Sequence, residues 1–166
     1  MMEPVPRRLD FRLLRPALLG FWALYFAIVA ASNLTDLLRT LDVLPASWRW
    51  VSGNLAFIGA ATGNADVPAW INPILLAGVI GWQALAAVLF WRAAREPGGR
   101  WLGPAFVSSL GLWGLFVLLD EILLIFETGA EATHLRLLSA ELLTLLLLLQ
   151  LDGARGGAQG STPAVK

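Results

Sequence analysis

The sequence has no cysteine and one histidine, and both facts limit its chemistry. Without cysteine the chain forms no disulfides, thiolate metal sites or thiol redox centres. The single histidine, His134, leaves little scope for imidazole-based metal or acid–base sites. Charged residues are also scarce, at 14% against roughly a quarter in soluble domains. The net charge is zero, so nothing points to nucleic-acid binding, and we expect no cofactor.

Apolar residues dominate instead, at 57% of the chain with a mean hydropathy of +0.68. They gather in four long runs, which reach or approach the roughly 20 residues that an α-helix needs to cross a bilayer. Because these runs lack the alternation of strands, they predict helices. We therefore expect an all-α, four-transmembrane-helix bundle in one domain, residues 1–152, surrounded by lipid. The predicted helices cover about 16–35, 71–92, 104–126 and 129–151.

The charges between the runs alternate in sign. The segment before the first run holds four arginines against two acidic residues, the 92–103 loop is also net basic, and the 36–70 loop is net acidic. By the positive-inside rule, this pattern predicts that the N and C termini are both cytoplasmic. An alternative interpretation of the first run is a cleaved signal peptide ending near Val29-Ala30-Ala31, although Trp22 and Tyr25 are atypical of one.

The outer loop, residues 36–70, is too apolar for a flexible linker. Leu37, Leu38 and Leu41 lie at helical spacing, and the Trp48-Arg49-Trp50 segment mixes tryptophan with charge, as segments at a membrane interface do. We expect one or two short amphipathic helices there. The chain after Asp152 is rich in glycine, which predicts a disordered cytoplasmic tail over residues 153–166.

Polar residues within the apolar runs are the informative ones, since a charge at the centre of a membrane helix costs about 2.5–3.5 kcal/mol. Asp120 lies about 9 Å below the outer end of the third predicted helix, and Arg136 lies about 10 Å below the start of the fourth. A very short turn joins these two helices, so the shared depth predicts an Asp120–Arg136 ion pair. Glu121 is an alternative partner, about 100° around the helix.

A second polar pair is predicted near the middle of the bilayer. Glu141 and Gln83 fall at the same depth on the fourth and second helices, about 18 Å from the outer end. Tyr25, halfway along the first helix, could join them. One hypothesis is a protonatable site on a transport or ligand pathway that also includes Asp120, Arg136 and Glu121. The other is a polar clamp that fixes helix packing.

The outer end of the fourth helix carries a third pattern. Thr128 and Glu131 have the spacing of a capping box before an apolar run. Glu131 and His134 also form a Glu-x-x-His sequence, and Glu127 lies four residues before Glu131. Di-iron bundles use two such motifs, and a chain with one histidine has only one. A metal site at Glu127, Glu131 and His134 is therefore the weaker alternative to a helix cap.

The Asn33-Leu34-Thr35-Asp36 sequence closes the first apolar run. It is similar to an Asn-x-x-Asp found at that place in a bacterial family of predicted small integral membrane proteins of unknown function. That family tends to carry an acidic residue where this chain has Gln83, and a Gly-Glu-Trp-Phe where it has residues 120–123. An early arginine in its fourth helix would match Arg136. The resemblance spans most of residues 16–151 and implies a four-helix layout in a bacterial inner membrane, with no activity.

Two function classes follow from these features. The first is a non-enzymatic accessory membrane subunit, or a self-associating scaffold, in which the polar residues act as clamps. Its partners would be other membrane subunits or further copies of the chain. The alternative is a small transporter or ligand-binding bundle with a protonatable intramembrane site around Glu141. The sequence contains no phosphate-binding glycine loop, His-Glu-x-x-His motif or nucleophile elbow, which makes an enzyme the less favoured class.

Overall fold

The computed structural model describes residues 11–63, 65–96, 98–123 and 129–159. Over these residues the chain is helical, with no strand, as predicted. A short 3-10 turn, η1, covers Ala69–Ile71. The α-helices are α1 (Phe11–Thr40), α2 (Asn54–Gly63), α3 (Asn72–Arg95), α4 (Leu102–Ile122) and α5 (Ala130–Gln159).

Four of the helices are long and apolar enough to cross a membrane: α1, α3, α4 and α5. They have 21 to 30 residues, or about 32–45 Å at 1.5 Å per residue, against roughly 30 Å of hydrocarbon. Pro73 lies in the first turn of α3, where no hydrogen bond is lost. The predicted fold class, an all-α bundle of four membrane-spanning helices, is confirmed.

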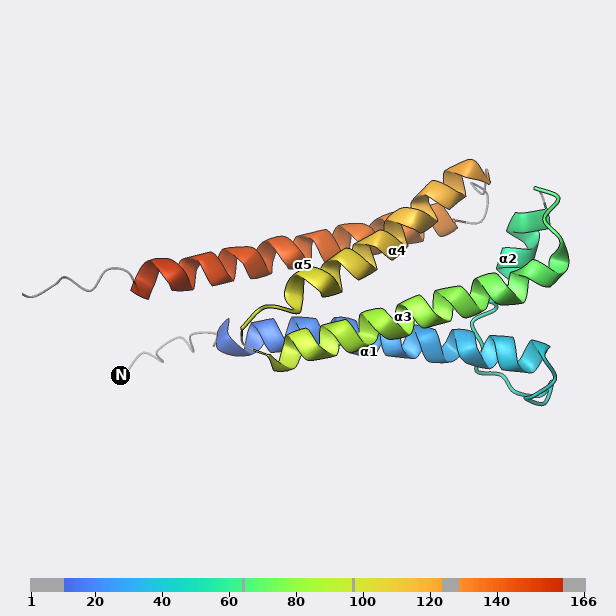
Figure 1. Ribbon diagram of the computed structural model, residues 1–166, viewed down its shortest axis with the longest axis horizontal. Coiled ribbons are helices and arrows are strands. Elements are labelled where there is room, and N and C mark those ends of the chain that lie inside the picture. Colours follow the sequence, from blue (N-terminus) through green and yellow to red (C-terminus); the bar gives the residue numbers. More distant parts are fainter. Residues whose placement is uncertain (1–10, 64, 97, 124–128, 160–166) are drawn as a thin grey trace, which may run out of the picture.

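The helices run up and down in two pairs (Figure 1). α1 packs along α3, and α4 packs against both α3 and α5. The start of α1 and the end of α5 lie at the same end of the bundle, where Arg15 and Asp152 form an ion pair at 3.6 Å. We call this the terminal end. At the opposite end, the α2 end, the α4–α5 pair diverges from α3 and α2 sits beside the start of α3.

An aromatic core joins α1, α3 and α4. The rings of Phe26 and Phe90 stack with centroids 5.8 Å apart, and Phe106 meets Phe90 edge-on at 5.1 Å. Trp22 and Trp113 extend the cluster on either side. Large aliphatic and aromatic side chains cover the outside of the bundle, which fits a hydrocarbon surrounding. α5 is the least covered helix, with 11% of its most apolar segment buried.

The loop between α1 and α3 differs in part from the prediction. α1 continues to Thr40, five residues beyond its predicted end, so Leu37 and Leu38 belong to its last turns and not to a separate helix. α2 and η1 are short helical segments in this loop, as expected, but α2 is apolar apart from Asn54 and Thr62 and so lacks the predicted amphipathic character.

α5 also extends further than predicted. It continues from Ala130 to Gln159, whereas the sequence predicted an end at Leu151 and a disordered tail from residue 153. Two consecutive glycines lower the stability of a helix but still allow one. Extending a helix that has already formed is easier than starting one, because each added residue that is ordered gains a backbone hydrogen bond. Residues 160–166 lie outside the described part of the chain.

Candidate functional site: polar clusters and a cavity between the helices

A chain of amides connects α1, α3 and the start of α2. The Asn33 side chain is fully buried, and its Nδ2 donates to Gln83 Oε1 at 2.8 Å. Its Oδ1 accepts from Asn54 Nδ2 at 2.7 Å, so Asn33 links α3 to the start of α2. Gln83 is thus engaged with α1, and its predicted contact with Glu141 is not observed. The sequence predicted that these two side chains lie at the same depth, but depth alone does not determine which neighbouring helix each side chain faces.

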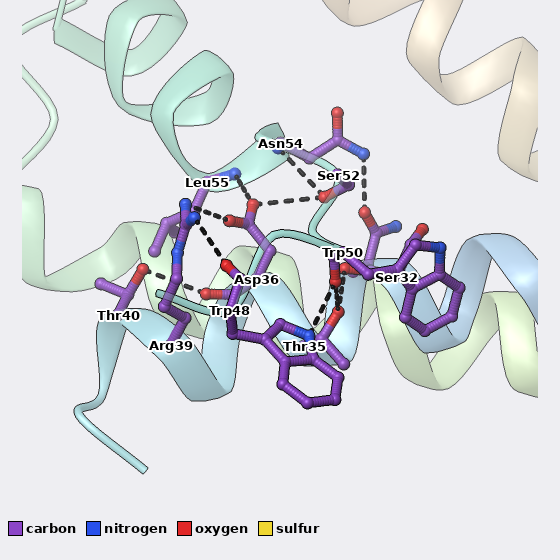
Figure 2. Close-up of polar contacts among 11 residues, drawn as sticks. Ser32, Thr35, Asp36, Arg39, Thr40, Trp48, Trp50, Ser52, Asn54 and Leu55 are labelled. Carbon is purple, nitrogen blue, oxygen red and sulfur yellow. Dashed lines mark hydrogen bonds and ion pairs between the residues drawn. The ribbon is translucent and has the colours of Figure 1, made fainter. Parts of the chain in front are cut away.

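Asp36 organises the polar contacts at the α2 end (Figure 2). Its Oδ2 accepts from the backbone N–H of Leu55 at 3.0 Å and from Ser52 Oγ at 3.2 Å. Arg39 lies 3.6 Å from its other oxygen. Because Leu55 is in the first turn of α2, Asp36 caps a helix that begins 18 residues later in the chain. The Asn33–Asp36 motif therefore fixes the loop between α1 and α3 onto α1.

Two tryptophans hold α5 in place near the middle of its length. Trp113 Nε1 donates to Glu141 Oε1 at 2.9 Å, and Trp22 Nε1 donates to Thr144 Oγ1 at 3.3 Å. The Glu141 side chain is fully buried, and its Oε2 has no hydrogen-bond partner within the described residues. Tyr25 packs against Trp113, with ring centroids 6.4 Å apart, so it joins this cluster through an aromatic contact.

The predicted Asp120–Arg136 ion pair is wrong. Asp120 Oδ2 lies 2.6 Å from Nδ1 of His134, and the Arg136 side chain is exposed. His134 and Arg136 are two residues apart, which separates them by about 200° around α5. Once His134 faces α4, Arg136 must point away from it. Glu121 is likewise exposed on the neighbouring position of α4.

Aromatic rings enclose His134. Trp113 stacks on it at a centroid distance of 5.9 Å, and Phe116 lies at 5.1 Å. This placement bears on the metal hypothesis, because Nδ1 of His134 is bound to Asp120, and Glu131 makes no polar contact with the part of the chain that the structure describes. Glu127 lies outside the described residues. Among those that are described, no three His, Asp or Glu side chains are grouped to hold a metal ion.

A cavity of about 610 Å³ opens between α2, α3, α4 and α5 at the α2 end. Its walls are mainly apolar, and its polar lining includes Gln83, Asp120 and His134. Of the six residues proposed from the sequence for a ligand pathway, Gln83 and Asp120 therefore line this cavity. Glu141 and Tyr25 lie in the separate cluster around Trp113, and Arg136 and Glu121 are exposed.

Sequence reasoning missed several residues that make these contacts. Trp22, Trp113, Ser52 and Asn54 all donate hydrogen bonds between elements. The two tryptophans gave a usable signal, since a buried indole N–H normally finds an acceptor, and the nearby helices offer few. Ser52 and Asn54 gave none, because loop positions acquire partners only when the loop folds back.

The arrangement defines a multi-pass helical membrane protein, whose four apolar helices carry polar contacts at their mutual interfaces. In comparisons with known proteins, no protein-family model, no curated protein and no solved structure matches the chain.

Proposed function

We propose that the chain is a non-enzymatic accessory or scaffold subunit of a bacterial inner membrane, with both termini in the cytoplasm. The alternation of basic and acidic loops supports this sidedness, and the resemblance of the Asn33–Asp36 motif supports the bacterial assignment. Polar side chains within the apolar helices bind partners on neighbouring helices, Gln83 to Asn33 of α1 and Glu141 to Trp113 of α4, which suits packing clamps.

The observation that carries the proposal is the outer face of α5, which we define as Arg136, Ser139, Leu143 and Gln150. All four side chains are exposed, and they lie within about 60° of one another around the helix. Arg136 has no partner within the described residues. A charge facing hydrocarbon is costly, and such residues normally face another helix. We therefore infer that a partner transmembrane helix carrying a carboxylate packs on this face.

The absence of cysteine makes a clean test feasible. Leu143→Cys would be coupled to a short photo-crosslinker in native membranes. We expect one defined adduct with a membrane protein, lost in the added Arg136→Leu background and kept with Arg136→Lys. Leu85→Cys is the matched control, because Leu85 is similarly exposed at a similar depth on α3.

An adduct between two copies of the chain would identify the self-associating form of the scaffold, with Glu121 as the available acidic group. If Leu143 yields only lipid adducts, as Leu85 is expected to, the proposal is wrong. Arg136 would then reach the headgroups along the membrane normal, as long basic side chains near helix ends do.

The cavity favours a second candidate function, a small ligand-binding bundle or transporter. Its volume lies in the range of about 300–1,000 Å³ typical of small-molecule sites. In this function Glu141, which lies outside the cavity lining in the Trp113 cluster, would be the protonatable intramembrane group, and Glu141→Gln would abolish activity while the fold persists. The clamp function predicts the opposite, namely lower stability without dependence on a solute.

A further inference from the structure

The cavity between α2, α3, α4 and α5 has walls suited to a hydrocarbon chain. α3 and α4 contribute aliphatic side chains to its walls, and residues of α2 and η1 line it at the α2 end. An apolar space of about 610 Å³ beside lipid favours apolar molecules over water. The apolar residues that line the cavity include Phe57, Ile58, Leu75, Leu76, Val79 and Leu119.

Most polar groups in this lining are already committed to other parts of the protein. Trp82 Nε1 donates to the Ser108 backbone oxygen at 2.9 Å. Thr62 donates to Asn72 at 2.8 Å, and the Asn54 amide nitrogen donates to Asn33. These groups therefore offer a ligand little. The cavity is apolar over most of its surface, and only a few of its atoms remain able to form a hydrogen bond with a ligand.

The free capacity belongs to His134, Asp120 and Gln83. A carboxylate only accepts hydrogen bonds, so the short Asp120–His134 contact places a proton on His134 Nδ1 when Asp120 is ionised. The other ring nitrogen, Nε2, has no partner in the described structure. It accepts a hydrogen bond when the ring is neutral and donates one when the ring is charged. Gln83 Oε1 is occupied by Asn33, which leaves its Nε2 as a donor.

We propose that this cavity binds a neutral, long-chain apolar molecule that ends in a hydroxyl group, with the hydroxyl at His134. A hydroxyl both donates and accepts hydrogen bonds, so it can bind Nε2 of His134 whether the imidazole ring is neutral or charged. A carbonyl oxygen only accepts, so it can bind this atom only when the ring is charged. A carboxylate ligand would face the Asp120 carboxylate nearby. The proposal rests on the second candidate function and is independent of the outer face of α5.

The experiment uses the full chain in liposomes and two photoactivatable probes that share a mid-chain diazirine. One is a hexadecan-1-ol analogue, and the other is the same hydrocarbon without the hydroxyl. We expect the alcohol to label cavity-lining peptides of α3 and α4, and excess hexadecan-1-ol to compete while hexadecane does not. Val79→Trp, which fills the cavity, should abolish this labelling. Val88→Trp, on the exposed side of the same helix, should leave it unchanged.

A second pair of variants tests the polar end. His134→Phe keeps a ring between Trp113 and Phe116 but removes Nε2, and should lower alcohol labelling about tenfold, the equivalent of one hydrogen bond. The Asp120→Leu/His134→Phe double variant removes the pair together, so no lone carboxylate stays buried, and should give the same loss. Hydrocarbon labelling should be unaffected in both.

The outcomes separate two failures. If both probes label the cavity equally and the His134 variants change neither, the hydroxyl specificity is wrong, although ligand binding stands. If Val79→Trp leaves the labelling by both probes unchanged, the cavity is not a binding site, and the second candidate function fails with the proposal.

Discussion

At the scale of single residues, the direction in which a side chain points decides its chemistry in this protein. His134 and Arg136 lie at nearly the same depth on α5. One faces α4 and meets Asp120 at 2.6 Å, and the other faces outward. Glu141 lies about two helical turns beyond His134 on α5 and is fully buried beside Trp113. Arg136 is therefore exposed on the outside of the bundle, while His134 lines the cavity.

The Trp113–Glu141 hydrogen bond should be a measurable clamp. Trp113→Phe removes the donor and leaves a fully buried carboxyl without its partner, so we expect a loss of about 1–3 kcal/mol in the free energy of unfolding. Glu141→Leu removes the need for that donor, and the double variant should recover part of the loss. The coupling energy should be about 0.6–1.7 kcal/mol, as for other hydrogen bonds between membrane helices.

The free energies of unfolding of the original protein, the two single variants and the double variant form a double-mutant cycle, and would be measured by reversible unfolding in mixed micelles. Trp70→Phe is the control, because Trp70 is 69% exposed. A Trp113→Phe variant no less stable than the control would contradict the clamp.

At the scale of elements, α2 depends on a residue of another helix. Its N-terminal backbone N–H groups have no partner within the helix, and Asp36 of α1 accepts from the N–H of Leu55 (Figure 2). Thr35 of α1 also holds the loop that precedes α2, because its Oγ1 donates to the backbone oxygen of Trp50 at 2.6 Å. α2 is short and mostly apolar, so its place at the mouth of the cavity follows from these contacts.

Asp36→Ala should loosen this element without melting the bundle. We expect a loss of about 1–2 kcal/mol, typical of a removed N-cap, and faster proteolysis between residues 41 and 53. Asp36→Asn is the matched variant, since asparagine also caps helices and should retain most of the stability. The readouts are thermal unfolding in detergent and limited proteolysis. Equal behaviour of the two variants would rule out the capping role.

At the scale of the whole molecule, the bundle combines a tightly packed half with an open half. α1 and α3 pack along their length around the Phe26–Phe90 stack, while α4 and α5 diverge toward the α2 end (Figure 1). The divergence creates the cavity and leaves α5 largely uncovered. Both features that we associate with function, the cavity and the outer face of α5, thus arise from the open half.

The proposed orientation gives a prediction for the entire chain. In intact cells, Trp50→Cys in the outer loop should react with a membrane-impermeant maleimide, and Gly98→Cys in the opposite loop should react only after permeabilisation. Both positions are exposed, and the chain has no other cysteine to confuse the result. Reversed labelling would overturn the assigned sidedness while leaving the four helices in place.

The sequence alone determined the number, type and approximate limits of the membrane-spanning helices, because the length and apolarity needed to cross hydrocarbon are properties of each segment by itself. It also indicated which polar residues matter, since Gln83, Asp120 and Glu141 are costly in such segments. Only the tertiary structure decided their partners. Rotation about each helix axis, the tilt of α4 and α5, and the folding back of residues 41–63 depend on packing among all the helices, and so they placed Asp120 against His134, Glu141 against Trp113 and Gln83 against Asn33.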